Sequence, residues 1–295
     1  MNKSCLIGFL MCSAFSLVVQ AATDGAHITK TISQIERKKG IKRTIQYRPD
    51  GNDFVCVNGK NRYTRALYGG ITDFRIETSD RPVFAAYKPK DSKHICFRLQ
   101  CGNQSIALDS LKFCEARYRA GRRTYRLTDP LLGKGELNIS VLAFPDAEGG
   151  IWRFTMKDMP EGALLHCYIS EIRAKNLSRN GDMGADRADS FDAPQLPKEQ
   201  KHYKLSLDGT TAYIVVEDQE LRLPALVEGT SLYDKSEKWR SEIESSLQIS
   251  TPDPYFNPLG GALAAAADGI WDGKIWLHGA IGWRSQLNGW RAAYI

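Results

Sequence analysis

From residue 44 to residue 223, short β-forming segments alternate with turn sequences. This alternation restricts the possible fold classes more than any other feature of the sequence. Three turn sequences, Pro49-Asp50-Gly51-Asn52, Gly102-Asn103 and Asp208-Gly209, each join two such segments, which predicts β-hairpins. The predicted hairpins pair 44–48 with 54–57, 94–101 with 105–108, and 203–207 with 211–216. Further strands are predicted at 62–67, 74–78, 83–87, 137–144, 151–156 and 164–172. Because no long helical period interrupts them, these strands predict a mainly β protein built as a large antiparallel β-sandwich.

The character of the sequence changes after Leu223. A helix is predicted over 233–247, where Trp239, Ile243 and Leu247 recur on one side. Pro252 and Pro254 then interrupt the helix, and an alanine-rich run over 262–267 predicts a second one. We therefore expect a signal peptide over 1–21, an N-terminal β-sandwich over 22–225, and a short helical segment over 226–295.

The N-terminus predicts export. Lys3 precedes an apolar run over 6–19, and Val19-Gln20-Ala21 has the small residues that signal peptidase reads, so the mature chain is expected to begin at Ala22. The apolar run is shorter than the roughly 20 residues of a membrane-spanning helix. A periplasmic or secreted protein is expected, with no membrane anchor after cleavage.

Five cysteines remain in the mature chain, an odd number that cannot all pair. They are Cys56, Cys96, Cys101, Cys114 and Cys167. Since no C-x-x-C spacing occurs, they are interpreted as small buried apolar residues and not as a zinc site. No metal and no cofactor is predicted.

The formal net charge of +6 includes a basic cluster between Lys30 and Arg43. Such a cluster can bind nucleic acid, but an exported protein rarely meets it, and a solvated basic face is the preferred interpretation. No nucleic-acid partner is expected.

A loop is predicted over 176–200, which is rich in aspartate, glycine and proline. The aspartates between Asp182 and Asp192 provide the hard oxygen ligands that calcium prefers, although EF-hand spacing is absent. A surface loop whose aspartates cap turns is the preferred interpretation, and calcium binding remains open.

Four of the six tryptophans lie in the last 25 residues, beside glycines and polar planar side chains. Sugars present flat C–H faces and hydroxyls, so aromatic platforms next to His, Arg, Asp and Asn suit a carbohydrate site. The predicted sugar-binding residues are Trp276, His278, Trp283, Arg284, Trp290 and Arg291. The alternative is structural, since single tryptophans are more often core residues.

The same segment resembles a known family. Asp253-Pro254-Tyr255-Phe256-Asn257, the alanine-rich helix, Asp268-Gly269-Ile270-Trp271 and Trp276-Leu277-His278 resemble the opening of the (α/α)6 barrel of six-hairpin glycosidases. The mature chain as a whole resembles exported bacterial proteins that carry the domain of unknown function DUF4450. The resemblance implies a β-sandwich followed by such a barrel and a role in polysaccharide breakdown.

The chain has room for only the first helices of that barrel, which needs about twelve of about 12 residues each. We expect a truncated, incomplete barrel whose catalytic carboxylates lie elsewhere, and we name no catalytic residue. Asp253, Asp268 and Asp272 are interpreted as turn residues. Glycosidases use two carboxylates that flank the bond, so this chain is expected to be inactive or nearly so.

Three hypotheses follow. The first is the N-terminal part of a glycoside hydrolase-like protein with a polysaccharide or oligosaccharide partner; the second is a non-catalytic glycan-binding or scaffold sandwich; the third is a structural export without a glycan. Motifs of serine hydrolases, zincins and nucleotide-binding proteins are absent from the sequence. The sequence specifies no particular sugar, linkage or oligomeric state.

Overall fold

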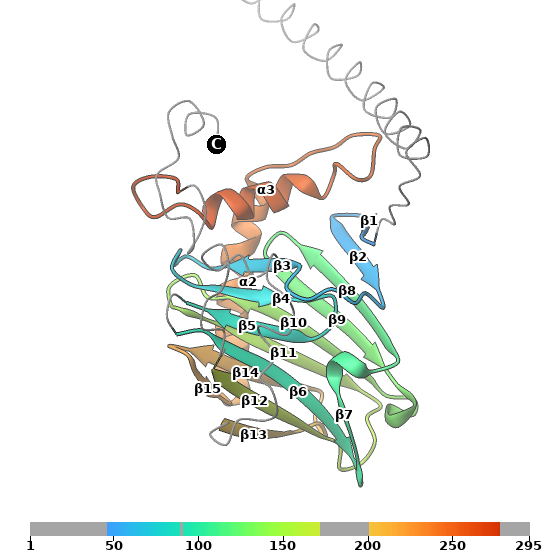
Figure 1. Ribbon diagram of the computed structural model, residues 1–295. Helices are drawn as coiled ribbons and strands as arrows, with labels where there is room; N and C mark the ends of the chain where they lie inside the picture. Colours follow the sequence, from blue (N-terminus) through green and yellow to red (C-terminus); the bar gives the residue numbers. More distant parts are fainter. Residues whose placement is uncertain (1–45, 89–90, 172–200, 278–295) are drawn as a thin grey trace, which may run out of the picture.

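The computed structural model describes residues 46–88, 91–171 and 201–277 (Figure 1). Within these ranges the chain forms two antiparallel sheets and two α-helices, which confirms a mainly β, sandwich-like fold. The predicted signal peptide and the aspartate-rich loop between Asp182 and Asp192 lie outside the described residues. Their interpretation stays a prediction.

The first sheet has eight strands in the order β1-β2-β8-β9-β10-β11-β14-β15. Their bounds are β1 Arg48–Asp50, β2 Asp53–Val57, β8 Phe113–Arg119, β9 Arg122–Thr128, β10 Glu136–Ala143, β11 Gly149–Lys157, β14 Thr211–Glu217 and β15 Glu220–Arg222. The central strands β8 to β11 follow one another in the chain and form a meander.

The second sheet has seven strands, six of them in the order β13-β12-β6-β5-β4-β3, with β7 also paired to β6. Their bounds are β3 Arg65–Tyr68, β4 Arg75–Thr78, β5 Val83–Tyr87, β6 Lys93–Cys101, β7 Gln104–Ala107, β12 Leu164–Glu171 and β13 Lys201–Ser206. Short 3-10 helices lie at Leu108–Ser110 and Pro130–Leu132.

Aromatic rings from both sheets form the centre of the core. The ring of Phe84 in β5 makes edge-on contacts with Phe97, Tyr125 and Trp152, at centroid distances of 5.8, 5.6 and 5.6 Å. Phe97 in turn contacts Phe154 at 5.5 Å. Because Tyr125, Trp152 and Phe154 belong to the first sheet and Phe84 and Phe97 to the second, this cluster joins the two layers.

A charged pair is buried at one end of the core. Arg123 in β9 and Asp80 after β4 are both fully buried, with Arg123 Nη2 at 3.9 Å from Asp80 Oδ1. Arg123 Nη2 also donates to Ser79 O and to the hydroxyl of Tyr47, each at 2.9 Å. This network links strand β9 of the first sheet to the chain that precedes β5 in the second.

Two of the three predicted hairpins are confirmed. β6 and β7 pair around Gly102-Asn103, and β1 and β2 pair around Gly51-Asn52. The latter turn is shorter than predicted, since Pro49 and Asp50 belong to strand β1.

The third predicted hairpin is wrong. β13 pairs with β12 in the second sheet, whereas β14 pairs with β11 and β15 in the first. The Leu207 N–H donates to Ala163 O and the Met156 N–H donates to Thr210 O, both at 2.9 Å, so the link runs beside the β11–β12 connection. Asp208-Gly209 therefore turns the chain from one sheet into the other.

The hairpin β8–β9 lies at the centre of the first sheet and is absent from the predicted strands. Its inward positions carry Cys114, Ala116, Tyr118, Tyr125 and Leu127, which belong to the core. Five arginines between residues 117 and 126 obscure this alternation in the sequence. Four of them, Arg117, Arg119, Arg122 and Arg126, form ion pairs on the outer face of the sheet, whereas Arg123 points inward to Asp80.

Two helices follow the sandwich, as expected. Helix α2 spans Leu226–Ser245 and packs on the outer face of β10, β11 and β14, and α3 spans Leu259–Asp268 (Figure 1). None of the helices formed by the described residues is long and apolar enough to cross a membrane.

The side chains that α2 buries are not the three that recur on one side in the sequence. Gly229, Tyr233, Ser236 and Arg240 are buried, while Leu247 lies beyond the helix and is 42 % exposed. The sheet surface beneath the helix is partly polar, so tyrosine, serine and arginine suit it better than a purely apolar stripe. A Cβ on Gly229 would lie 2.4 Å from the Tyr213 ring, which shows how closely the helix approaches the sheet.

The five cysteines are free, and Cys56, Cys114 and Cys167 are buried, in agreement with their interpretation as small apolar residues. Burial raises the pKa of the Cys114 thiol to about 12 and that of Cys96 to about 11. These thiols are therefore protonated and poorly nucleophilic near neutral pH.

His94 in β6 gives folding a specific pH dependence. Burial, followed by repulsion from Arg62, lowers the pKa of His94 to about 4. Since an unfolded histidine titrates near 6.5, the unfolded state binds more protons between pH 6.5 and 4, and stability falls as the pH falls through this window. We expect the free energy of unfolding to drop by about 3 kcal/mol from pH 7 to pH 4 on account of His94.

Urea denaturation at pH 7, 6 and 5 checks this prediction, because carboxylates titrate mostly below that range. His94→Gln is expected to flatten the dependence in part, since burial also lowers the pKa of His166. An unchanged slope in the variant would contradict the assignment to His94.

Candidate functional site

Of the six predicted sugar-binding residues, Trp276 is described. The other five, His278, Trp283, Arg284, Trp290 and Arg291, lie outside the described residues. Trp276 forms an isolated β-bridge with Trp271, and the two rings lie 4.6 Å apart at 50°. The Trp271 side chain is 36 % exposed, so this pair offers an aromatic surface next to α3.

Two of the three nearby aspartates act in turns, as interpreted from the sequence. Asp253 Oδ1 accepts the Tyr255 N–H at 2.9 Å, and Asp272 Oδ1 accepts the N–H groups of Lys274 and Ile275. Asp268 ends helix α3, and burial raises the pKa of its carboxyl group.

A polar cavity of about 360 Å³ lies on the outer face of the first sheet, at the edge of α2. We call it the arginine groove. It is lined by Glu115, Arg117, Arg122, Thr124, Tyr125, Arg126, Asn138, Ile139, Ser140, Arg153, Thr155 and Tyr233. Its volume falls within the range of roughly 300–1,000 Å³ that is usual for small-molecule sites.

The strand register explains why these side chains meet. Arg117 pairs with Thr124, Thr124 with Ser140, and Ser140 with Arg153, which places four polar residues in a row across β8 to β11. A parallel row two residues further along contains Glu115, Arg126, Asn138 and Thr155. Because alternate residues of a strand face the same side, both rows lie on the outer face.

Most of the groove's arginines are neutralised at its margin. Arg117 pairs with Glu115, Asp50 and Asp53. Arg126 pairs with Glu115 and Glu136, while Arg122 pairs with Glu237 of helix α2 at 2.7 Å. Hydrogen bonds from Arg117, assisted by its charge and by Arg126, lower the pKa of the Glu115 carboxyl group. Glu115 is therefore held ionised and is a poor proton donor.

Arg153 in β11 differs from the others. Its guanidinium carbon lies 3.8 Å from the ring centroid of Tyr233, whose hydroxyl group is hydrogen-bonded to Ser140 Oγ at 2.7 Å. The Nε atom of Arg153 is buried and has no hydrogen-bond partner among the described residues. The Tyr233 ring thus fixes the guanidinium plane without neutralising its charge.

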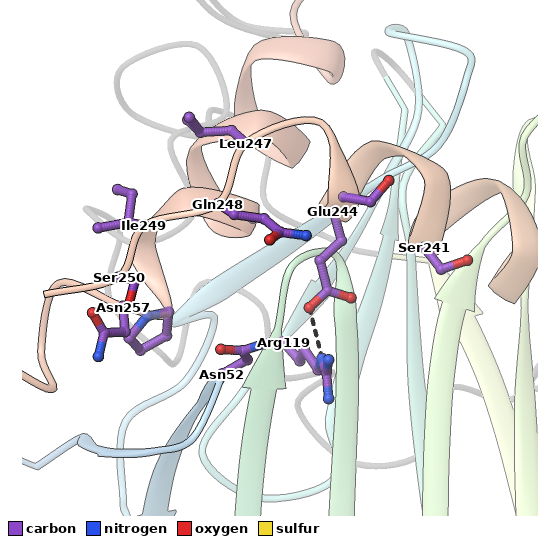
Figure 2. Close-up of a pocket in the computed structure, with 12 residues that line it drawn as sticks. Asn52, Arg119, Ser241, Glu244, Leu247, Gln248, Ile249, Ser250 and Asn257 are labelled. Atoms are coloured by element: carbon purple, nitrogen blue, oxygen red, sulfur yellow. Dashed lines mark hydrogen bonds and ion pairs between the residues drawn. The ribbon is translucent and has the colours of Figure 1, made fainter. Parts of the chain in front are cut away.

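A second cavity, of about 300 Å³, lies between the end of α2, the start of α3 and the β1–β2 turn (Figure 2). We call it the helix crevice. Glu244 points towards Arg119 and accepts its Nε–H at 2.7 Å, and Arg240 donates to the other carboxylate oxygen at 2.8 Å. Burial alone would raise the pKa of Glu244, but these two arginines lower it. The charges here satisfy one another and fasten α2 to β8, so the crevice is a helix-packing feature.

Metal-binding clusters of three or more His, Cys, Asp or Glu side chains do not occur among residues 46–88, 91–171 and 201–277. The groove is lined by arginine, threonine and asparagine side chains, whose chemistry is hydrogen bonding and charge pairing.

The arginine groove is not among the sites predicted from the sequence. The missed signal is the alternation of polar and inward-facing residues in Glu115-Ala116-Arg117 and Thr124-Tyr125-Arg126. Recognising it requires placing β8 beside β9, and the helix side chain Tyr233 comes from more than 100 positions further along.

Most of the groove lies within a segment that matches a known family model. Residues 89–217 match the model of the family described as Domain of unknown function (DUF4450), which supports the resemblance of this segment to that family. The matched range contains β6 to β14 and all groove residues except Tyr233. No curated protein matches the chain.

Proposed function

We propose that this protein is a glycan-binding β-sandwich of an exported polysaccharide-degrading system, and that the arginine groove holds part of a polysaccharide or oligosaccharide. The observation that carries the proposal is the groove itself: a cavity of about 360 Å³ with planar or hydroxyl-bearing side chains arranged on a rigid sheet. Sugars require several oriented hydrogen bonds, and side chains fixed on strands supply them with little loss of entropy.

Recognition in the groove would depend on hydrogen bonds more than on stacking. Thr124 and Thr155 offer hydroxyl groups, and Asn138 offers an amide. The ring of Tyr233 is covered by Arg153, so this face of the ring is occupied. The exposed Trp271 is not one of the groove's lining residues, so stacking on it, or on the tryptophans predicted after it, would belong to a separate surface.

The proposal includes export and a link to hydrolysis. The signal-peptide sequence over 1–21 supports a periplasmic or secreted location. The helices α2 and α3 that follow the sandwich, with the Trp271–Trp276 pair beside them, support a glycoside hydrolase-like relationship in which an (α/α)6 barrel begins here. Binding without catalysis is favoured for the groove itself, because Glu115, its one lining carboxylate, is ionised by its arginines.

Filling the groove tests the binding proposal. Thr124→Trp in the full chain is expected to weaken oligosaccharide binding at least 10-fold, because the indole ring would fill part of the cavity that Thr124 lines, as measured by calorimetry against a panel of oligosaccharides. Ser206→Trp, an exposed site on β13 of the other sheet, is the matched control and is expected to bind normally.

An assay for newly formed reducing ends on the same samples distinguishes a binding module from a hydrolase. Binding without release of reducing ends supports a binding module. Release of reducing ends by the full chain supports the hydrolase reading, and equal binding by Thr124→Trp and the unmodified chain removes the groove as the site.

A further inference from the structure

Resting on the proposed glycan-binding function, we propose that the arginine groove selects acidic sugars, with Arg153 binding the carboxylate of a uronic acid residue. The starting observation is a difference between the groove's arginines. Arg117, Arg122 and Arg126 each have carboxylate partners, whereas Arg153 has none among the described residues.

The position of Arg153 makes this charge available to a ligand. Its neighbours across the sheet are Ser140 on β10 and Tyr213 on β14. The Ser140 hydroxyl is engaged with Tyr233, and the Tyr213 hydroxyl is engaged with Thr230, so neither is an anionic partner for the guanidinium group. The charge of Arg153 therefore remains directed to the cavity that it lines.

The Arg153 side chain lacks both a charge partner and a hydrogen-bond acceptor for its Nε–H among the described residues. Arg153 is half-buried, and its Nε–H is removed from solvent without a hydrogen bond among the described residues. Buried polar groups are nearly always paired, and an unpaired one in a stable protein calls for an explanation. A ligand carboxylate accepting from the two Nη groups would not pair the Nε–H, but it would supply the missing charge partner in the bidentate geometry that arginine favours.

The surrounding groups suit a sugar acid better than a multiply charged anion. The other three arginines have carboxylate partners, so Arg153 is the one lining cation without such a partner among the described residues, which matches one carboxylate. Thr124, Asn138 and Thr155 lie along the two adjacent rows and can bond to the hydroxyls of the same or the next sugar ring. A polyanion such as a nucleic-acid strand would instead meet Glu115 and the carboxylates around it.

The test uses matched ligands and matched variants of the full chain. Oligosaccharides of galacturonic, glucuronic and mannuronic acid are compared with the same oligosaccharides after reduction of their carboxyl groups to alcohols. We expect at least one acidic oligosaccharide to bind about 10–100-fold more tightly than its reduced form, because a hydrogen bond to a charged group changes affinity by a factor of about this size. Arg153→Gln is expected to abolish that difference.

Arg98→Gln, on the outer face of the second sheet, is the control and should leave the acidic preference intact. Thermal unfolding verifies that both variants are folded. Two outcomes overturn this inference but leave the proposed glycan binding in place. The unmodified chain binds acidic and reduced forms equally, or the preference for acidic forms persists in Arg153→Gln. Absence of binding by every oligosaccharide, acidic or reduced, overturns the proposed function as well.

Discussion

Replacing Arg123 by methionine is expected to lower the free energy of unfolding by about 3–5 kcal/mol, because the change removes one partner of a fully buried ion pair. Arg123 and Asp80 have no exposed side-chain surface. Without the guanidinium group, the Asp80 carboxylate would lose its positive neighbour in a low-dielectric interior, where an isolated charge is costly.

The remaining contacts of Asp80 do not replace that charge. Its Oδ2 accepts the Asn61 N–H at 2.9 Å, and its Oδ1 accepts the hydroxyl groups of Thr64 and Tyr47. These are neutral donors, which stabilise a carboxylate less than a cation does. Ser79 O would also lose the bond that it accepts from Arg123 and keep the one from Tyr125.

Urea denaturation measures the effect, and two further variants interpret it. Arg98→Met changes an arginine on the outer face of the second sheet and is expected to shift stability by no more than about 0.5 kcal/mol. Arg123→Met combined with Asp80→Asn is expected to cost less than the sum of the two single changes, because the buried charge is then removed. Additive single effects would contradict the pair's coupling.

Truncating Phe84 to alanine is expected to destabilise the fold by about 3–5 kcal/mol. The ring is fully buried and contacts Phe97, Tyr125 and Trp152 edge-on, so its loss leaves a cavity between the two sheets and removes three aromatic pairs. Backbone relaxation cannot close this gap easily, because β5 is hydrogen-bonded on both sides.

Phe84→Leu retains much of the apolar volume and should cost less than Phe84→Ala. Phe256→Ala serves as the control, since that ring is 45 % exposed and the change is expected to stay within about 0.5 kcal/mol. If Phe84→Ala and Phe256→Ala unfold at similar denaturant concentrations, the aromatic contacts of Phe84 do not stabilise the packing of the two sheets.

The predictable part of the fold coincides with apolar segments bounded by turn residues. The strand predicted over 137–144 is β10, and the one predicted over 151–156 is β11. In β10, Leu137, Ile139 and Val141 alternate with outward-facing positions, and glycines flank the apolar segments of both strands. The alanine-rich run likewise forms α3. Such local preferences require no knowledge of distant partners.

The candidate site was much less predictable. The sequence drew attention to the tryptophans after residue 270, of which Trp271 and Trp276 pack on each other. The groove instead collects arginines from β8, β9 and β11, with carboxylate partners as distant as Asp50 and Glu237. Charged residues at alternate positions predict a strand only weakly when the residues that pair with them are not known.

The sequence by itself determined most of the strands, though not β8 and β9, the presence of two helices, where most turns fall, and that the cysteines lack metal-binding spacing, since these follow from local backbone preferences and burial. The tertiary structure alone decided which sheet each strand joins, as with β13 and β14 around the same Asp208-Gly209 turn. It also decided that Arg153 is the groove arginine without a carboxylate partner among the described residues. Pairing and charge compensation depend on groups brought together across more than a hundred residues, as the ion pairs Arg119–Glu244 and Arg122–Glu237 show.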